Sequence, residues 1–205
     1  MKQKIFLDIV PEQQTGSDIE SEATTVINDG IDPKTFYDQA RQRLLNVNGW
    51  HELAGTLSAK FQAVDPGGKE VERPVEKGDY MRINIPGPGN KAGDEYDWVR
   101  VEEIQEIEDN DMQSIGFRVR PTNNPLSDDD STAHFYNDSG TSNFIITREG
   151  YKITASIIDR NLSPNTKPDS LIDKIRDAIV GAGAVAGFSK IQWQTLADGL
   201  VEIKE

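Results

Sequence analysis

Cationic side chains recur at alternate positions along several short apolar segments, and two aromatic residues share their spacing. Successive side chains of an extended strand point to opposite faces of a sheet. If Met81, Val99 and Val119 face a core, the opposite face gathers the charged and aromatic neighbours. These neighbours are Lys60, Tyr80, Arg82, Trp98, Arg100, Arg118 and Arg120.

Arginines beside aromatic rings suit the binding of carboxylate or phosphate groups, because the guanidinium donates two parallel hydrogen bonds and stacks on rings. The pattern therefore predicts a site for an acidic ligand or an acidic protein partner. The alternative is a solvated face, on which the arginines pair across strands with Glu102 and other acids and serve solubility alone.

Motifs for catalysis or metal binding are incomplete. The segment "HELAG" at His51 lacks the second histidine of a zinc-protease helix, and His134 lies far away in the sequence. His51 is expected to pack at a helix end, and His134 within a strand. The segment "SGTSN" lacks the spacing of a nucleophile elbow, and "LSDDDST" lacks the order of an EF-hand loop. We therefore predict no catalytic residue, no metal ligand and no cofactor.

A loop rich in glycine and proline, "PGPGNKAGDEYD", follows Ile85. A phosphate cradle needs converging backbone N–H groups and a helix behind them, whereas Pro86 and Pro88 remove two donors and a strand follows. The loop is predicted to connect two strands, and its acidic residues are expected to keep it exposed to solvent.

The change of apolar period along the chain predicts the secondary structure. Asp32 and Pro33 start a helix over 33–46, with apolar residues at helical spacing. Alternation then predicts strands, and Glu149-Gly150 predicts a tight hairpin between the last two. The predicted strands cover 57–63, 80–85, 98–104, 115–120, 143–148 and 151–158.

The two ends of the chain read differently. A short strand is expected within 2–10, followed by a polar, acidic segment that buries little and is predicted to be a flexible linker. Near the other end, a helix capped by Asp169 or Ser170 runs into "GAGAVAG". A second helix is predicted to start at Ser189, which forms a capping box with Gln192, while Phe188 and Trp193 take the staple positions.

Composition narrows the class of protein. The chain has 205 residues, no cysteine and a formal net charge of −13. The negative charge repels phosphate backbones, so no nucleic-acid partner is predicted. The N-terminal apolar run is too short for a signal peptide and the longest apolar stretch too short for a membrane span. A soluble, cytoplasmic protein is expected.

Taken together, the elements predict an α+β fold: a single domain with a curved or barrel-like antiparallel sheet packed by one N-terminal and two C-terminal helices. Residues 1–31 form the N-terminal strand and flexible linker, and 32–205 the domain. This order of elements is similar to that of helix-grip ligand-binding domains, in which a curved sheet wraps a long helix around a cavity. The similarity concerns the fold and rests on no motif, and the predicted break near Gly187-Phe188 departs from that fold's continuous helix.

Three functions follow from these patterns. The first is a non-enzymatic binding protein that uses the arginine and aromatic face against an acidic ligand or partner. The second is a small-molecule pocket or enzyme between sheet and C-terminal helix, with His51 or Tyr80 as acid or base. The third is a structural subunit that forms an oligomer or larger assembly through its apolar C-terminal helices.

Overall fold

The computed structural model describes residues 8–28, 30–55, 58–85, 93–109, 111–165 and 182–203. The predicted strand within 2–10, the loop 86–92 and the first predicted C-terminal helix fall wholly or mostly outside these ranges. The elements are β1 (Ser17–Val26), α1 (Pro33–Leu45), the 3-10 turn η1 (Val47–Gly49), α2 (Trp50–Leu53), β2 (Lys60–Val64), β3 (Tyr80–Asn84), β4 (Asp97–Glu108), β5 (Met112–Pro121), β6 (Thr141–Glu149), β7 (Lys152–Leu162) and α4 (Ala182–Leu200).

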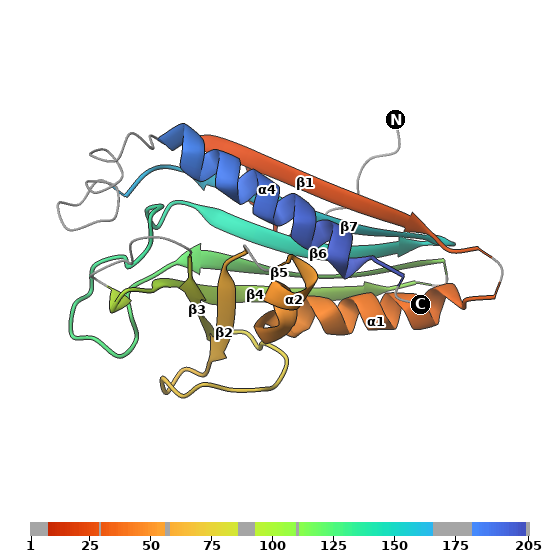
Figure 1. Ribbon diagram of the computed structural model, residues 1–205, viewed down its shortest axis with the longest axis horizontal. Coiled ribbons are helices and arrows are strands. Elements are labelled where there is room, and N and C mark those ends of the chain that lie inside the picture. Colours follow the sequence, from red (N-terminus) through yellow and green to blue (C-terminus); the bar gives the residue numbers. More distant parts are fainter. Residues whose placement is uncertain are drawn as a thin grey trace.

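The strands form one antiparallel sheet of seven strands in the order β1-β7-β6-β5-β4-β3-β2 (Figure 1). The predicted α+β fold with an antiparallel sheet is confirmed. The sheet is open, with β1 and β2 at its edges, and is not closed into a barrel. The predicted hairpin between β6 and β7 is present, but Glu149 pairs with Lys152, so the two connecting residues are Gly150 and Tyr151 rather than Glu149 and Gly150. Gly150 has a φ of 59°.

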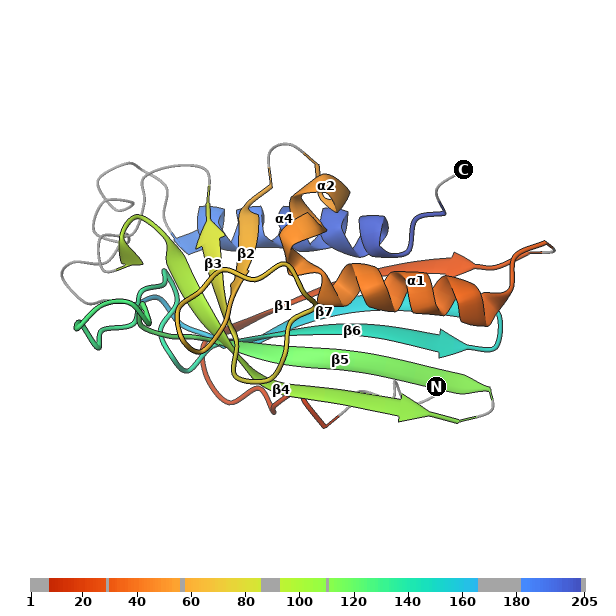
Figure 2. The same cartoon turned by 90° about the horizontal axis from the view of Figure 1, so that it is seen from below.

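All the described helices pack on one face of this sheet, which we call the inner face (Figure 2). Trp50 lies at the centre of the core and is fully buried. Its ring stands 4.7 Å from that of Phe144 and 5.1 Å from that of Phe61, measured between centroids. The N-terminal segment crosses the opposite, outer face, where Ile9 packs on Ile145 and Ile158.

Helix α1 begins as its sequence predicts. The Asp32 carboxylate accepts a hydrogen bond from the Thr35 backbone N–H at 2.9 Å, and Pro33 occupies the first turn. A side chain that caps free N–H groups in this way stabilises a helix start. Phe36, Ala40 and Leu44 are buried against the sheet, so the predicted spacing is confirmed.

The acidic N-terminal segment contains a strand that was predicted to be flexible linker. Residues 17–26 form β1, which pairs with β7 along its length. Ile19, Ser21 and Ala23 turn inward while the acids between them turn outward, and Arg160 on β7 pairs with Asp18 and Glu20. Sparse apolar residues suffice here because the neighbouring strand supplies the backbone hydrogen bonds.

Helix α4 is continuous through Gly187 and Phe188, so the predicted break there is wrong. Ser189 lies inside the helix and is buried, and the Gln192 side chain accepts a hydrogen bond from the Ala59 N–H at 3.2 Å. The capping box is therefore not used as a helix start. Gly199 allows α4 to approach α2, since a Cβ there would lie 2.5 Å from the Leu53 carbonyl oxygen.

Polar side chains of α4 cover the exposed edge of the sheet. Lys190 donates to the Glu20 carbonyl, and Gln194 donates to the Glu22 carbonyl at 2.9 Å. An edge strand with free carbonyls invites pairing with another chain, and this contact blocks it. The next turns bury Leu196 and Leu200 in this chain's own core. None of the helices in the described ranges has the length and apolar content that crossing a membrane requires.

Candidate functional site

Strand register brings most of the predicted cationic and aromatic residues to the outer face of β2 to β5. Tyr80 lies opposite Arg100, and Arg82 opposite Trp98. Arg100 in turn lies opposite Arg120 on the next strand. Lys60 stands apart on the edge strand β2, opposite Asn84. The alternation that was read from the sequence is present, but the surroundings of each side chain differ.

Trp98 is buried, although it lies on the outer face. Its side chain is 2% exposed and packs with Val64 and Ala133, and its indole N–H donates to the Gly93 carbonyl at 3.1 Å. The segment that contains Ala133 covers it. Trp98 therefore forms a small second core and offers no ring surface to a ligand.

Arg82 is occupied by two neighbours. Its guanidinium lies 4.5 Å from the centroid of the Tyr96 ring and 2.7 Å from a carboxylate oxygen of Glu70. The Glu70 carboxylate neutralises the charge of Arg82, and the Tyr96 ring covers the flat face of its guanidinium.

Arg118 and Arg120 share one carboxylate. The Glu102 side chain accepts from Arg118 at 2.8 Å and from Arg120 at 2.5 Å. The pairing of β4 with β5 slips by one residue here, so Glu102 and Glu103 both fall on the outer face. Arg118 also donates to the Ile9 carbonyl at 3.0 Å, and Arg120 to the Asp138 carbonyl at 2.8 Å. Through these hydrogen bonds, Arg118 holds the N-terminal segment and Arg120 holds the segment before β6 against the outer face of the sheet.

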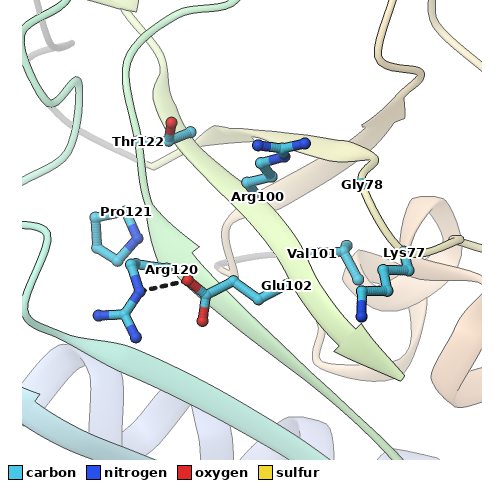
Figure 3. Close-up of a pocket in the computed structure, with 8 residues that line it drawn as sticks. All are labelled: Lys77, Gly78, Arg100, Val101, Glu102, Arg120, Pro121 and Thr122. Atoms are coloured by element: carbon cyan, nitrogen blue, oxygen red, sulfur yellow. Dashed lines mark hydrogen bonds and ion pairs between the residues drawn. The ribbon is translucent and has the colours of Figure 1, made fainter. Parts of the chain in front are cut away.

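A shallow hollow of about 440 Å³, the outer groove, remains between β4, β5 and the segment before β3. Its lining consists of Lys77, Gly78, Arg100, Val101, Glu102, Arg120, Pro121 and Thr122. Figure 3 shows the Arg120 guanidinium turned to Glu102 and the Arg100 guanidinium directed away from both. Lys77 pairs with Glu103 at 2.8 Å and thereby holds the pKa of that carboxyl below its usual value.

Arg100 differs from the other groove cations. It is exposed, and its guanidinium lies 5.6 Å from the centroid of the Tyr80 ring. It makes no ion pair with any residue of the described ranges. Arg100 is therefore the cation of the outer groove that no described acid pairs with.

A second hollow lies on the inner face, between the sheet and α4. This inner cavity has a volume of about 40 Å³. Its walls are mostly apolar and aromatic, with a few polar groups from three parts of the chain. The lining consists of Phe61, Met81, Ile83, Val99, Val119, Ser142, Phe144 and Asp159 from the sheet, His134, Phe135 and Tyr136 from the segment before β6, and Ser189 and Trp193 from α4.

Asp159 is the acid of the inner cavity. It is 1% exposed and lies opposite Ser142 in the pairing of β6 with β7. Oδ2 accepts a hydrogen bond from the Trp193 indole N–H at 2.8 Å, whereas Oδ1 is buried without a hydrogen-bond partner among the described residues. Burial raises the pKa of Asp159 to about 7, although Ser142 and Trp193 oppose the rise.

The two other titratable side chains of the cavity stay neutral. The Nδ1 atom of His134 accepts from the Tyr136 backbone N–H at 3.0 Å, and burial lowers the pKa of this imidazole to about 3. Burial raises the pKa of Tyr136 to about 12, helped by the nearby Asp159. The Tyr136 hydroxyl lies near Ser189 but makes no hydrogen bond of normal length within the described ranges. Asp159 is thus the group of this cavity that ionises near neutral pH.

Neither acid-base candidate of the pocket hypothesis lies in this cavity. Tyr80 is on the outer face, and His51 is half-buried on α2, where its Nδ1 lies 3.0 Å from the Asn48 carbonyl oxygen. The sequence did hold a signal for Asp159, because alternation from Ile153 and Ile157 places it on the inner face. Within the described ranges, no three His, Asp or Glu side chains gather closely enough to hold a metal ion.

No protein-family model matches this sequence, and no curated protein matches it either. Among solved structures, the fold is similar to that of the hypothetical protein jhp0584 from Helicobacter pylori, with a TM-score of 0.52 at 11% identity over 91% of this chain and 87% of that one. The protein TTHA0849 from Thermus thermophilus gives a TM-score of 0.45 at 9% identity, over 90% and 97% of the two chains. Major latex-like protein 151 from Panax ginseng gives 0.35 at 13% identity, over 86% and 97%. The first of these likenesses shows a shared fold, and none of them assigns a function.

Proposed function

We propose that this chain is a non-enzymatic protein that binds a small molecule through the inner cavity. The observation that carries the proposal is the buried carboxylate of Asp159, whose Oδ1 has no hydrogen-bond partner in the described part of the chain. A polar atom left unpaired in an apolar interior costs free energy, and a water or ligand group that pairs with it recovers part of that cost.

A second buried aspartate, Asp79, allows a comparison of hydrogen-bond partners within the same chain. Asp79 is also 1% exposed, but it accepts from Arg73 at 2.6 and 3.0 Å and from the Glu76 N–H at 2.8 Å. Both oxygens of the Asp79 carboxylate therefore accept hydrogen bonds from residues of the same chain. Asp159 lacks such a set among the described residues, and this contrast favours a ligand role for it.

The size of the cavity limits what enters it. One water-sized group needs roughly 10 to 15 Å³. A cavity of about 40 Å³ therefore receives roughly three or four non-hydrogen atoms, such as the polar end of a ligand. Phe135 and Trp193 are only partly buried, so the remainder of a ligand would pass these rings toward the surface.

The test compares the wild-type cavity with one that a larger side chain partly fills. Ser142→Val adds bulk at the cavity wall, and Ser156→Val makes the same change on the outer face of β7. We expect fragments of a few non-hydrogen atoms, screened by ligand-observed NMR, to bind the wild type and Ser156→Val but not Ser142→Val. A screen in which no fragment distinguishes the two variants would contradict the proposal.

A second candidate function is the capture of an anion at the outer groove, as the arginine and aromatic pattern predicts. It is favoured by one observation, the lack of an ion-pair partner for the exposed Arg100 within the described ranges. The groove is shallow and wet, so we expect weak and salt-sensitive binding of carboxylates or phosphates. Binding of inorganic phosphate that Arg100→Glu does not weaken would remove this candidate.

A further inference from the structure

We propose that the group received by the inner cavity is a small protonated amine, held by the Asp159 carboxylate among aromatic rings. This inference rests on the proposed function and names the class of its ligand.

The charge of the cavity points to a cation. Asp159 is the one residue among the described cavity walls that carries charge at pH 8, since His134 and Tyr136 stay neutral there. The charge of the adjacent Arg160 favours the ionised form of Asp159, but the Arg160 side chain does not line the cavity, and its guanidinium pairs with Asp18 and Glu20. A buried carboxylate is costly unless it is paired, so the missing positive charge is expected from the ligand.

The hydrogen-bonding groups agree with an ammonium. The Oδ1 of Asp159, which no described residue pairs with, can only accept once the acid is ionised, and an ammonium brings three donors. The hydroxyls of Ser142 and Tyr136 line the same space and can accept further donors. An anionic ligand would instead face a carboxylate of its own sign.

Aromatic rings line the same cavity as Asp159. The Trp193 ring lies 5.3 Å from that of Phe144 and 6.2 Å from that of Phe61, and both phenylalanines line the cavity. Ring faces attract organic cations, and the attraction grows where water is excluded. A hydrated metal ion fits poorly, because aromatic walls cannot replace its oxygen ligands.

The charge of the whole molecule acts in the same direction. A net charge of −13 raises the concentration of cations near the surface and lowers that of anions. This field does not select an amine by itself, so the test must separate specific pairing from general attraction.

The experiment titrates ethylamine hydrochloride, ethanol and potassium chloride into ¹⁵N-labelled protein at pH 8, and follows the indole N–H signal of Trp193. At this pH Asp159 is ionised and the alkylamine is protonated, as a lysine would be. We expect ethylammonium to shift this signal saturably, with at least tenfold higher affinity than ethanol, and potassium to leave it in place.

Asp159→Asn keeps the shape of the side chain and removes its charge. It should lower the affinity for ethylammonium at least tenfold. Asp198→Asn, an exposed substitution on α4, changes the net charge equally and should leave the affinity unchanged. If Asp159→Asn does not fold, the preference for ethylammonium over ethanol in the wild type decides alone.

The outcomes separate the two proposals. Ethanol binding as tightly as ethylammonium, or an unaltered ethylammonium affinity in Asp159→Asn, would overturn the amine while fragments blocked by Ser142→Val still supported a binding cavity. An equal response to potassium would assign the site to inorganic cations and overturn the amine as well. No binding of any probe, and no fragment sensitive to Ser142→Val, would overturn both.

Discussion

The outer groove and the inner cavity differ in how far each satisfies its own charges. At the groove, Lys77 pairs with the neighbouring Glu103, and Arg120 shares the Glu102 carboxylate with the neighbouring Arg118. Arg100 is left without an acid among the described residues, and water reaches it. The lining of the cavity holds a single charged group, Asp159, which is buried, and one of its oxygens is unpaired by any described residue.

The number of charged side chains at a site therefore says little about its capacity to bind a ligand. Exposed ion pairs contribute little free energy, because water competes for both partners and salt screens them. A buried charge without a full set of partners is destabilising, and a ligand that completes the set recovers that free energy. The region with fewer charges is therefore the stronger candidate.

The largest expected effect tests the acid of the cavity. Because burial raises the pKa of Asp159 from 3.8 unfolded to about 7 folded, the folded state keeps a proton that the unfolded state has released between these values. The contribution of this group to stability is fully present below about pH 4 and is lost as pH rises through about 7. Three pKa units correspond to about 4 kcal/mol.

Asp159→Asn should abolish this loss, so the variant should be more stable than the wild type at pH 8 and the advantage should shrink toward pH 4. Urea unfolding between pH 4 and 8 measures it, with Asp198→Asn as control for the change in net charge. Parallel pH profiles of wild type and Asp159→Asn would show that burial does not raise the pKa of this carboxyl.

The next effect concerns Trp98, which was predicted to be a ligand contact on the outer face. Because its indole is buried beside Val64 and Ala133, Trp98→Ala should lower the free energy of unfolding by about 3 kcal/mol. Urea unfolding measures this value. A loss below about 1 kcal/mol would instead return Trp98 to the exposed surface, where a partner could contact it.

The sequence predicted the elements with strong local signals. Asp32-Pro33 at the start of α1 and the alternation of β3 to β5 need only neighbouring residues to be read. The same alternation placed the arginines on one face. It could not show that Glu70, Glu102 and Tyr96 occupy them, because those contacts join residues distant in sequence.

Other features depend on the fold as a whole. Strand β1 is polar and becomes ordered because β7 and α4 satisfy its backbone. The slipped register at Glu102 violates the alternation on which strand reading rests. Ser189 and Gln192 match a helix start, yet the sheet and Ala59 bury them inside α4. Asp159 had a readable position, but its missing partner became visible only with the surrounding side chains.

A smaller effect would change the balance of charge in the outer groove. Glu102→Gln removes the carboxylate that Arg118 and Arg120 share, so it should cost about 1 kcal/mol of stability. It also leaves both guanidinium groups able to bind an anion. We expect inorganic phosphate to bind this variant several-fold more tightly than wild type at low salt, as measured by NMR titration. Unchanged phosphate affinity would show that the groove does not act as an anion site even when its internal acid is removed.

The smallest effect on stability is expected for Arg100→Glu, and it separates the two regions most cleanly. Arg100 is exposed and makes no ion pair within the described ranges, so the free energy of unfolding should change by less than about 0.5 kcal/mol. Phosphate binding at the outer groove should be lost, while the binding of ethylammonium at Asp159 should persist, because the two sites lie on opposite faces of the sheet. Lys152→Glu, at the far end of β7, makes the same change in net charge and should preserve both. If Arg100→Glu and Lys152→Glu weaken phosphate binding equally, the anion is attracted by the field of the whole protein, and the inner cavity alone remains as a site.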